Sequence, residues 1–139
     1  MLGLYYRIWV DCIKRARQQP ANRENWPVGT MISMTLAMSF NFILIMTLLE
    51  KFVFKKYFYK IDFEFLPGRI NNVLAFIFLF ILPCLIINYL LIFMNKRYEK
   101  LLKRYPYYIG KLFIIYFLIS MMFPIILLFG SILLSYLLE

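Results

Sequence analysis

The residues of this chain that could do chemistry are few and widely separated. It has no histidine, so a zinc or haem site would depend on Cys12, Cys84 and some of the seven Asp and Glu residues. A catalytic site would have to rest on Asp62, Glu64 and Arg69, but a carboxylate pair two residues apart is common by chance. The five glycines form neither a Walker nor a dinucleotide-binding spacing. The sequence therefore predicts a protein that is not an enzyme and that holds no metal or cofactor.

The composition indicates a membrane protein. Of the 139 residues, 63% are hydrophobic and 17% charged, whereas a soluble domain is about half apolar and a quarter charged. The net charge is +9 and the mean hydropathy is +0.74. Nucleic-acid-binding proteins carry their basic stripe on a polar surface, which a chain this apolar lacks. We therefore expect anionic lipid headgroups, and no nucleic acid, as the counterpart of the charge.

Three runs without Asp, Glu, Lys or Arg cover residues 27–49, 73–94 and 112–138. Each contains the roughly 20 residues that a helix needs to cross a bilayer. None shows the alternation of a membrane β-strand. The predicted fold is an all-α integral membrane protein with three transmembrane helices. Since intramembrane charges mark proton and ion paths, their absence argues against an ion-coupled transporter.

Residues 1–19 have the pattern of an amphipathic helix. Apolar side chains from Leu2 to Ala16 recur at spacings of three and four, while Asp11 and the basic residues fall on the other face. We expect this helix to lie in the cytoplasmic interface, with docking onto a partner helix as the alternative. Its charges also argue against a cleavable signal peptide. Residues 20–26 are predicted to form a hinge.

The cations predict the orientation. Eleven Lys and Arg lie in the N-terminal segment and the loop 95–111, against five in the loop 50–72. The positive-inside rule then places the N-terminus in the cytoplasm and the C-terminus outside. The loop 95–111 is predicted to continue the second span as a helix that ends at Tyr105 before Pro106. Nine cations are expected to bind lipid headgroups, with an acidic protein surface as the alternative: Arg7, Lys14, Arg15, Arg17, Lys96, Arg97, Lys100, Lys103 and Arg104.

The outer loop 50–72 contains an alternating aromatic pattern. Its apolar members, Tyr59, Ile61, Phe63 and Phe65, are separated by charged residues. This period predicts a short strand. Such a strand would lie in the interface or would add to the sheet of another protein.

The first span carries a small-residue stripe, defined by positions four residues apart: Gly29, Ser33, Ala37 and Asn41. Such a stripe lets a second helix approach closely, either from the same chain or from a partner. Asn41 and Asn88 should lie roughly 11 Å apart in depth, from the helical rise, so each needs its own hydrogen-bond partner. A hydrophilic substrate path is the alternative for these amides.

Two prolines are predicted to kink spans near their midpoints. Pro83 frees the carbonyl of Leu79, and Pro124 frees that of Ser120, because proline has no N–H for the helical bond. Paired kinks occur in the broken helices of transporters, but proline is also common in ordinary transmembrane helices.

These features favour a non-enzymatic accessory or scaffolding subunit of a larger membrane complex, binding a membrane-protein partner or forming a homo-oligomer. The alternatives are a self-assembling, holin-like pore and an immunity-type membrane inhibitor. Abundant Ile, Phe, Lys, Asn and Tyr are typical of AT-rich coding, which favours a bacterium and hence the bacterial cytoplasmic membrane.

Overall fold

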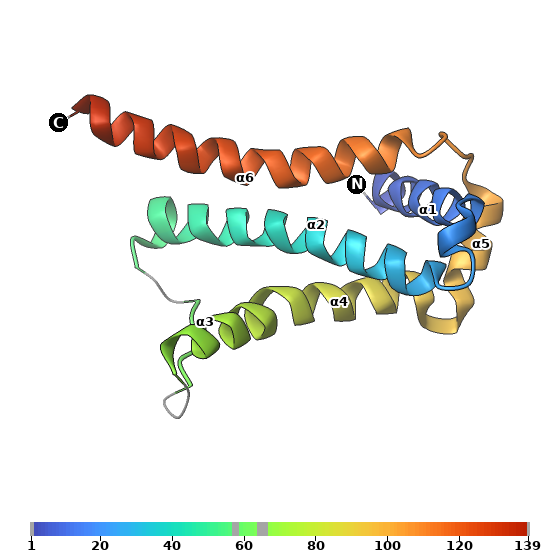
Figure 1. Ribbon diagram of the computed structural model, residues 1–139, viewed down its shortest axis with the longest axis horizontal. Helices are drawn as coiled ribbons and strands as arrows, with labels where there is room; N and C mark the ends of the chain where they lie inside the picture. The colour runs from blue at the N-terminus through green and yellow to red at the C-terminus, as the bar shows by residue number, and fades with distance from the viewer. Residues whose placement is uncertain (1, 57–58, 64–66, 139) are drawn as a thin grey trace.

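The computed structural model describes residues 2–56, 59–63 and 67–138, and all regular secondary structure in these ranges is helical (Figure 1). The α-helices are α1 (Leu2–Gln18), α2 (Trp26–Leu48), α3 (Gly68–Phe76), α4 (Leu82–Asn88), α5 (Arg97–Arg104) and α6 (Lys111–Leu138). Wider π-helical turns follow α2, α3 and α4, at Leu49–Phe54, Ile77–Ile81 and Tyr89–Phe93. Short 3-10 turns cover Pro20–Asn22 and Met94–Lys96. The all-α prediction is confirmed.

Two helices are long and apolar enough to cross a membrane. They run over Trp26–Phe54 and Gly68–Arg104, and only 22% and 17% of their most apolar stretches are buried within the protein. A core helix of a soluble protein would be mostly buried. The exposed apolar side chains on these helices instead suit contact with lipid. Helix α6 runs beside α2 as one helix through Pro124 (Figure 1).

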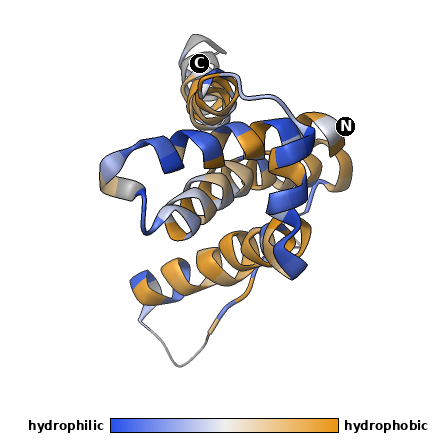
Figure 2. Cartoon of the chain, turned by 90° about the vertical axis from the view of Figure 1, so that its right-hand side faces the viewer, coloured by the Kyte–Doolittle hydropathy of each residue, from blue (hydrophilic) through white to orange (hydrophobic). Residues whose placement is uncertain are grey.

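Helix α1 crosses one end of the bundle at a steep angle to α2 and α6, as Figures 1 and 2 together show. It contacts α2, α5 and α6. The principal buried cluster forms where it crosses: Ile8, Trp9, Cys12 and Ile13 of α1, with Met34 of α2 and Ile92 of the turn after α4. The tightest packing therefore lies at this end, and the outward surfaces of the long helices stay apolar and exposed.

The second long helix is interrupted near its C-terminal end. The predicted helix that ends at Tyr105 is present as α5, but it does not continue the second span directly, because Asn95 and Lys96 both have left-handed backbone angles, with φ of 54° and 53°. These residues break the helix, and α5 turns to cross the same end of the bundle as α1 (Figure 1). Tyr98, Leu101 and Leu102 then pack against the buried cluster under α1.

Of the predicted strand 59–65, the described residues 59–63 do not form a strand. The backbone N–H groups of Tyr59 and Phe63 donate to side-chain oxygens of Glu50 and Asn71, each at 2.9 Å. Side chains of the flanking helices therefore accept the hydrogen bonds that these two N–H groups would donate to a neighbouring strand. Ile61 is exposed, and Phe65 lies outside the described residues.

Candidate functional site

The end of the bundle crossed by α1 is organised around Asp11, a fully buried carboxylate. Its Oδ1 accepts from the backbone N–H of Tyr108 at 2.9 Å and of Gly110 at 3.0 Å, and its Oδ2 accepts from Phe113 at 3.3 Å. These donors precede or open α6, where unpaired N–H groups and the helix dipole favour an anion. Asp11 thus caps α6 from another helix, and its predicted place on the solvent face of α1 is wrong.

The turn before α6 is shaped to reach this carboxylate. Ile109 and Gly110 both have left-handed backbone angles, with φ of 59° and 75°, and such turns gather N–H groups on one side. A Cβ at position 110 would lie 2.6 Å from Cδ of Arg15. Glycine at position 110 therefore suits both its left-handed backbone angle and the close approach of the Arg15 side chain.

Two cations of α1 that were predicted to bind headgroups make contacts within the chain. Lys14 Nζ donates to the carbonyl oxygen of Tyr105 at 3.2 Å. The guanidinium of Arg17 lies 4.2 Å from the centre of the Trp26 ring and 5.7 Å from that of Tyr98. Cation–π contacts of this kind join the C-terminal end of α1 to α2 and α5.

The remaining predicted headgroup residues fall into two sets. Arg15 is half-buried and faces α6, and Arg7 is exposed on α1. The other five are exposed on or just before α5: Lys96, Arg97, Lys100, Lys103 and Arg104. We call these five, together with the adjoining Arg17, the cationic platform. Figure 2, viewed from this end, shows hydrophilic residues along α1 and α5.

The predicted packing residues are divided between the interior and an open surface. Ala37 is buried, and Asn41 Nδ2 donates to Ser120 Oγ at 2.9 Å, which joins α2 to α6. Gly29 is exposed, with no atom within 4 Å of the position that a Cβ would take. The Ser33 hydroxyl donates to the Gly29 carbonyl at 2.9 Å. Only the second half of the stripe therefore packs against this chain.

Asn88 is fully buried and belongs to a separate polar cluster. Its Nδ2 donates to Thr35 Oγ1 at 3.2 Å, and its Oδ1 accepts from the hydroxyl of Tyr5. The cluster thereby joins α1, α2 and α4. The amides of Asn41 and Asn88 bond to different partners, and both hold helices of this chain together.

The carbonyl of Leu79, four residues before Pro83, has a partner from the outer loop. The Tyr59 hydroxyl donates to the Leu79 carbonyl at 2.8 Å. The Tyr59 ring also packs edge-on against Phe42 and Phe80, with centroids 5.8 Å and 5.6 Å away. Tyr59 thus fastens the loop to the helices. Phe63 likewise packs against Phe78, at 5.9 Å between centroids.

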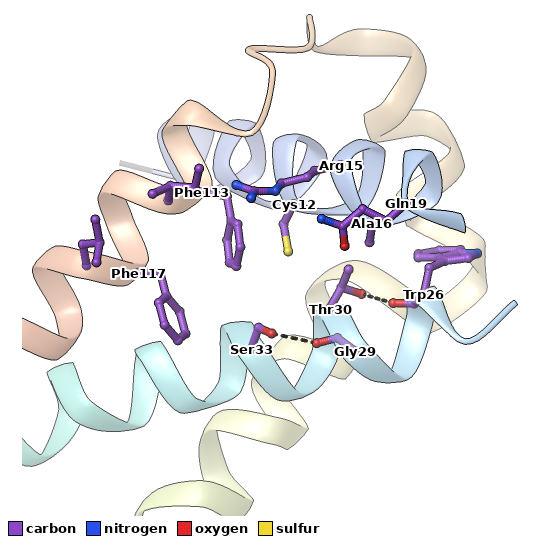
Figure 3. Close-up of a pocket in the computed structure, with 12 residues that line it drawn as sticks. Cys12, Arg15, Ala16, Gln19, Trp26, Gly29, Thr30, Ser33, Phe113 and Phe117 are labelled. Atoms are coloured by element: carbon purple, nitrogen blue, oxygen red, sulfur yellow. Dashed lines mark hydrogen bonds between the residues drawn. The ribbon is translucent and has the colours of Figure 1, made fainter. Parts of the chain in front are cut away.

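A groove of about 320 Å³ opens between α1, α2 and α6. Figure 3 shows its polar mouth, with Arg15 of α1 and Gln19 just after α1, and its apolar length, with the rings of Phe113 and Phe117 directed toward α2. Gly29 and Ser33 line the side formed by α2. The open half of the small-residue stripe therefore lies in this groove.

Cys12 also lines the groove, but its thiol is poorly suited to react. Burial, together with the nearby Asp11, raises the pKa of Cys12 from its ordinary value of 9.0 to about 12. The reactive form of cysteine is the thiolate. We therefore expect maleimide to label folded protein much more slowly at pH 7.5 than protein unfolded in detergent and urea, as measured by intact mass.

The same raised pKa predicts a loss of stability in alkali. A thiol that ionises less readily when folded favours folding fully below its unfolded pKa, and this contribution falls as pH rises from about 9 to about 12. Burial also raises the pKa of Tyr5 to about 12, which acts in the same direction. The melting temperature should therefore fall above pH 9, and less steeply in Cys12→Ala. Parallel pH profiles for the variant and the parent protein would contradict this assignment.

Among the residues that the structure describes, no three His, Cys, Asp or Glu side chains gather in a group that could hold a metal ion. The functional groups that sequence reasoning missed are Asp11 as a helix cap and the mouth of the groove around Arg15. Comparison with protein-family models, with curated proteins and with solved structures gives no match to this chain.

Proposed function

We propose that the protein is a non-enzymatic accessory subunit of a membrane complex that presents the cationic platform to a partner at the membrane surface. In this proposal α2, the α3–α4 helix and α6 cross a bacterial cytoplasmic membrane. Helix α1 lies in the cytoplasmic interface, and its steep angle to α2 and α6 suits that position (Figures 1 and 2).

The placement predicts a cytoplasmic N-terminus and an external C-terminus. The two basic segments lie together at the end crossed by α1 and α5, as the positive-inside rule requires of segments on one side. Alkaline phosphatase fused after Glu139 should therefore be active, because that enzyme needs an oxidising compartment. A fusion of green fluorescent protein at the same point, bright at normal expression, would contradict this orientation.

The observation that carries the proposed function is the rigid attachment of the cationic platform. Asp11 binds α1 to α6, Arg17 stacks on Trp26 and Tyr98, and α5 packs on the buried cluster. Five cations on or before α5 remain exposed. A charged surface held in one conformation loses little entropy when it binds, which suits recognition of an acidic surface.

The buried polar groups favour this function over a pore. A water-filled pore needs a polar stripe along whole helices. The amides of Asn41 and Asn88 and the hydroxyl of Ser39 instead bond to other helices of the same chain. These interactions stabilise a fixed bundle.

Co-purification with charge reversal tests the proposed function. Extraction in mild detergent should give a complex with a partner in fixed stoichiometry. The double variant Lys100→Glu, Lys103→Glu should lose that partner, because both side chains are exposed on α5. The matched control Lys55→Glu, Lys56→Glu reverses two exposed cations of the outer loop and should keep it. A single species without a stoichiometric partner would contradict the proposal.

A further inference from the structure

We propose that the groove between α1, α2 and α6 binds one anionic phospholipid, with its phosphate at Arg15 and an acyl chain along Phe113 and Phe117. This site is distinct from the cationic platform. The inference rests on the proposed membrane location but not on the accessory role, so a failed co-purification would leave it standing.

The charge at the mouth of the groove needs a counterion. Arg15 is half-buried, and in the described part of the chain no Asp or Glu forms an ion pair with it. The nearest acidic group along α1, Asp11, is occupied by three backbone N–H groups of the α6 turn. A guanidinium in this position favours a phosphate, which can accept two parallel N–H bonds from it.

The length of the groove suits an acyl chain. Phe113, Phe117 and Leu118 line it on α6, and Gly29 and Ser33 line it on α2. Its volume of about 320 Å³ lies at the lower end of the range, about 300–1,000 Å³, that is typical of small-ligand sites. The open space over Gly29 lets a chain lie against the backbone of α2.

The charged end and the apolar end of the groove are arranged like the headgroup and the acyl chain of a lipid in the bilayer. Arg15 of α1 and Gln19 just after it supply the charged and amide lining, at the end of the bundle that carries the basic segments. The hydroxyls of Thr30 and Ser33 on α2 donate to carbonyls of their own helix. The apolar lining of the groove runs from the start of α6 toward the middle of the long helices (Figure 3). A phosphate at Arg15 therefore places the attached acyl chain along the transmembrane direction.

Charge disfavours a second copy of this chain as the occupant. Each copy carries a net charge of +9, and its three charge-free runs contain no carboxylate that could reach Arg15. An anionic phospholipid supplies both the negative charge and the apolar chain in one molecule, and the bilayer provides it at high local concentration.

Native mass spectrometry of the delipidated full chain in detergent tests this site. Titration with dioleoylphosphatidylglycerol should show one bound lipid, with an affinity at least about tenfold above that for dioleoylphosphatidylcholine, as expected for one charge-assisted contact. Inorganic phosphate alone should not compete. Equal affinity for the two lipids, full competition by inorganic phosphate, or a stable dimer that takes up no lipid would each overturn the proposal.

Two variants separate the headgroup contact from the acyl-chain contact. Arg15→Gln should remove the preference for phosphatidylglycerol, whereas Arg15→Lys should keep only part of it, because the charge remains but the two parallel N–H bonds are lost. Gly29→Leu should weaken binding of both lipids at least about tenfold by filling the groove. Its added side chain starts in open space, so the variant should fold.

Each variant has a matched control. Arg7→Gln removes an exposed cation from the same helix, and Gly130→Leu makes the same exchange at another helical glycine with open space around it. Both should bind lipid as the parent protein does. Unchanged lipid binding in Gly29→Leu, or an equal loss in Gly130→Leu, would overturn the assignment to this groove.

Discussion

Asp11→Ala is expected to lower the free energy of unfolding by about 3 kcal/mol or more, because three backbone N–H groups lose a charged acceptor. Those groups belong to Tyr108, Gly110 and Phe113, and the bond from Gly110 is buried, so its N–H cannot readily regain water. The loss should exceed that of an ordinary N-cap, about 0.5–2 kcal/mol, because the carboxylate also joins two helices. The effect comes from packing at the end of the bundle and does not depend on a partner.

Unfolding of Asp11→Ala in detergent, followed by circular dichroism against heat or denaturant, measures this loss. The stability of Asp11→Asn should lie between that of Asp11→Ala and that of the parent protein, because the amide keeps one oxygen acceptor but has no charge. The control Asp62→Ala removes an aspartate that is 60% exposed and paired with the exposed Lys60, and it should change little. An Asp11→Ala protein as stable as the parent would contradict the capping role.

Trp9→Ala is expected to have an effect of similar or larger size. Trp9 is fully buried in the cluster under α1 and packs edge-on against Phe93, with 5.8 Å between ring centroids. Removing a buried tryptophan side chain typically costs about 3–5 kcal/mol through lost contacts and the cavity that remains. The variant should therefore unfold at markedly lower temperature or detach α1 from the bundle.

Two control variants distinguish the loss of the buried Trp9 side chain from a general effect of removing an aromatic ring. Trp9→Phe keeps a ring in the cluster and should retain much of the stability. Phe129→Ala removes a ring that is 66% exposed on α6, and it should be nearly neutral. If Phe129→Ala and Trp9→Ala lowered the melting temperature equally, the buried cluster would not be the main stabilising element.

The all-α class could be predicted from the sequence because charge-free apolar runs of this length admit few structures. The helical face of α1 was also readable from its spacing. The burial of Asp11 was not, because its three donors lie about one hundred positions away in the sequence and periodicity reports only local geometry. A lone carboxylate within an otherwise basic helix was the one available signal.

The break at Asn95 and Lys96 in the second long helix shows a different limit of prediction from sequence. Asn tolerates left-handed backbone angles, so Asn95 marked a plausible end, but Lys96 carries no such signal. The turn forms because it brings Tyr98 and Leu101 onto the cluster under α1, which is a tertiary effect. The groove was unpredictable for a similar reason, since its three walls come from separate parts of the chain.

The most direct measurement of the proposed function is photo-cross-linking in intact cells, with a photoreactive amino acid in place of Lys100. This position is exposed on α5 within the cationic platform. The proposal predicts one discrete protein adduct, absent when the same amino acid replaces Lys55 in the outer loop. No protein adduct from Lys100, or the same adducts from both positions, would contradict a partner bound at the platform.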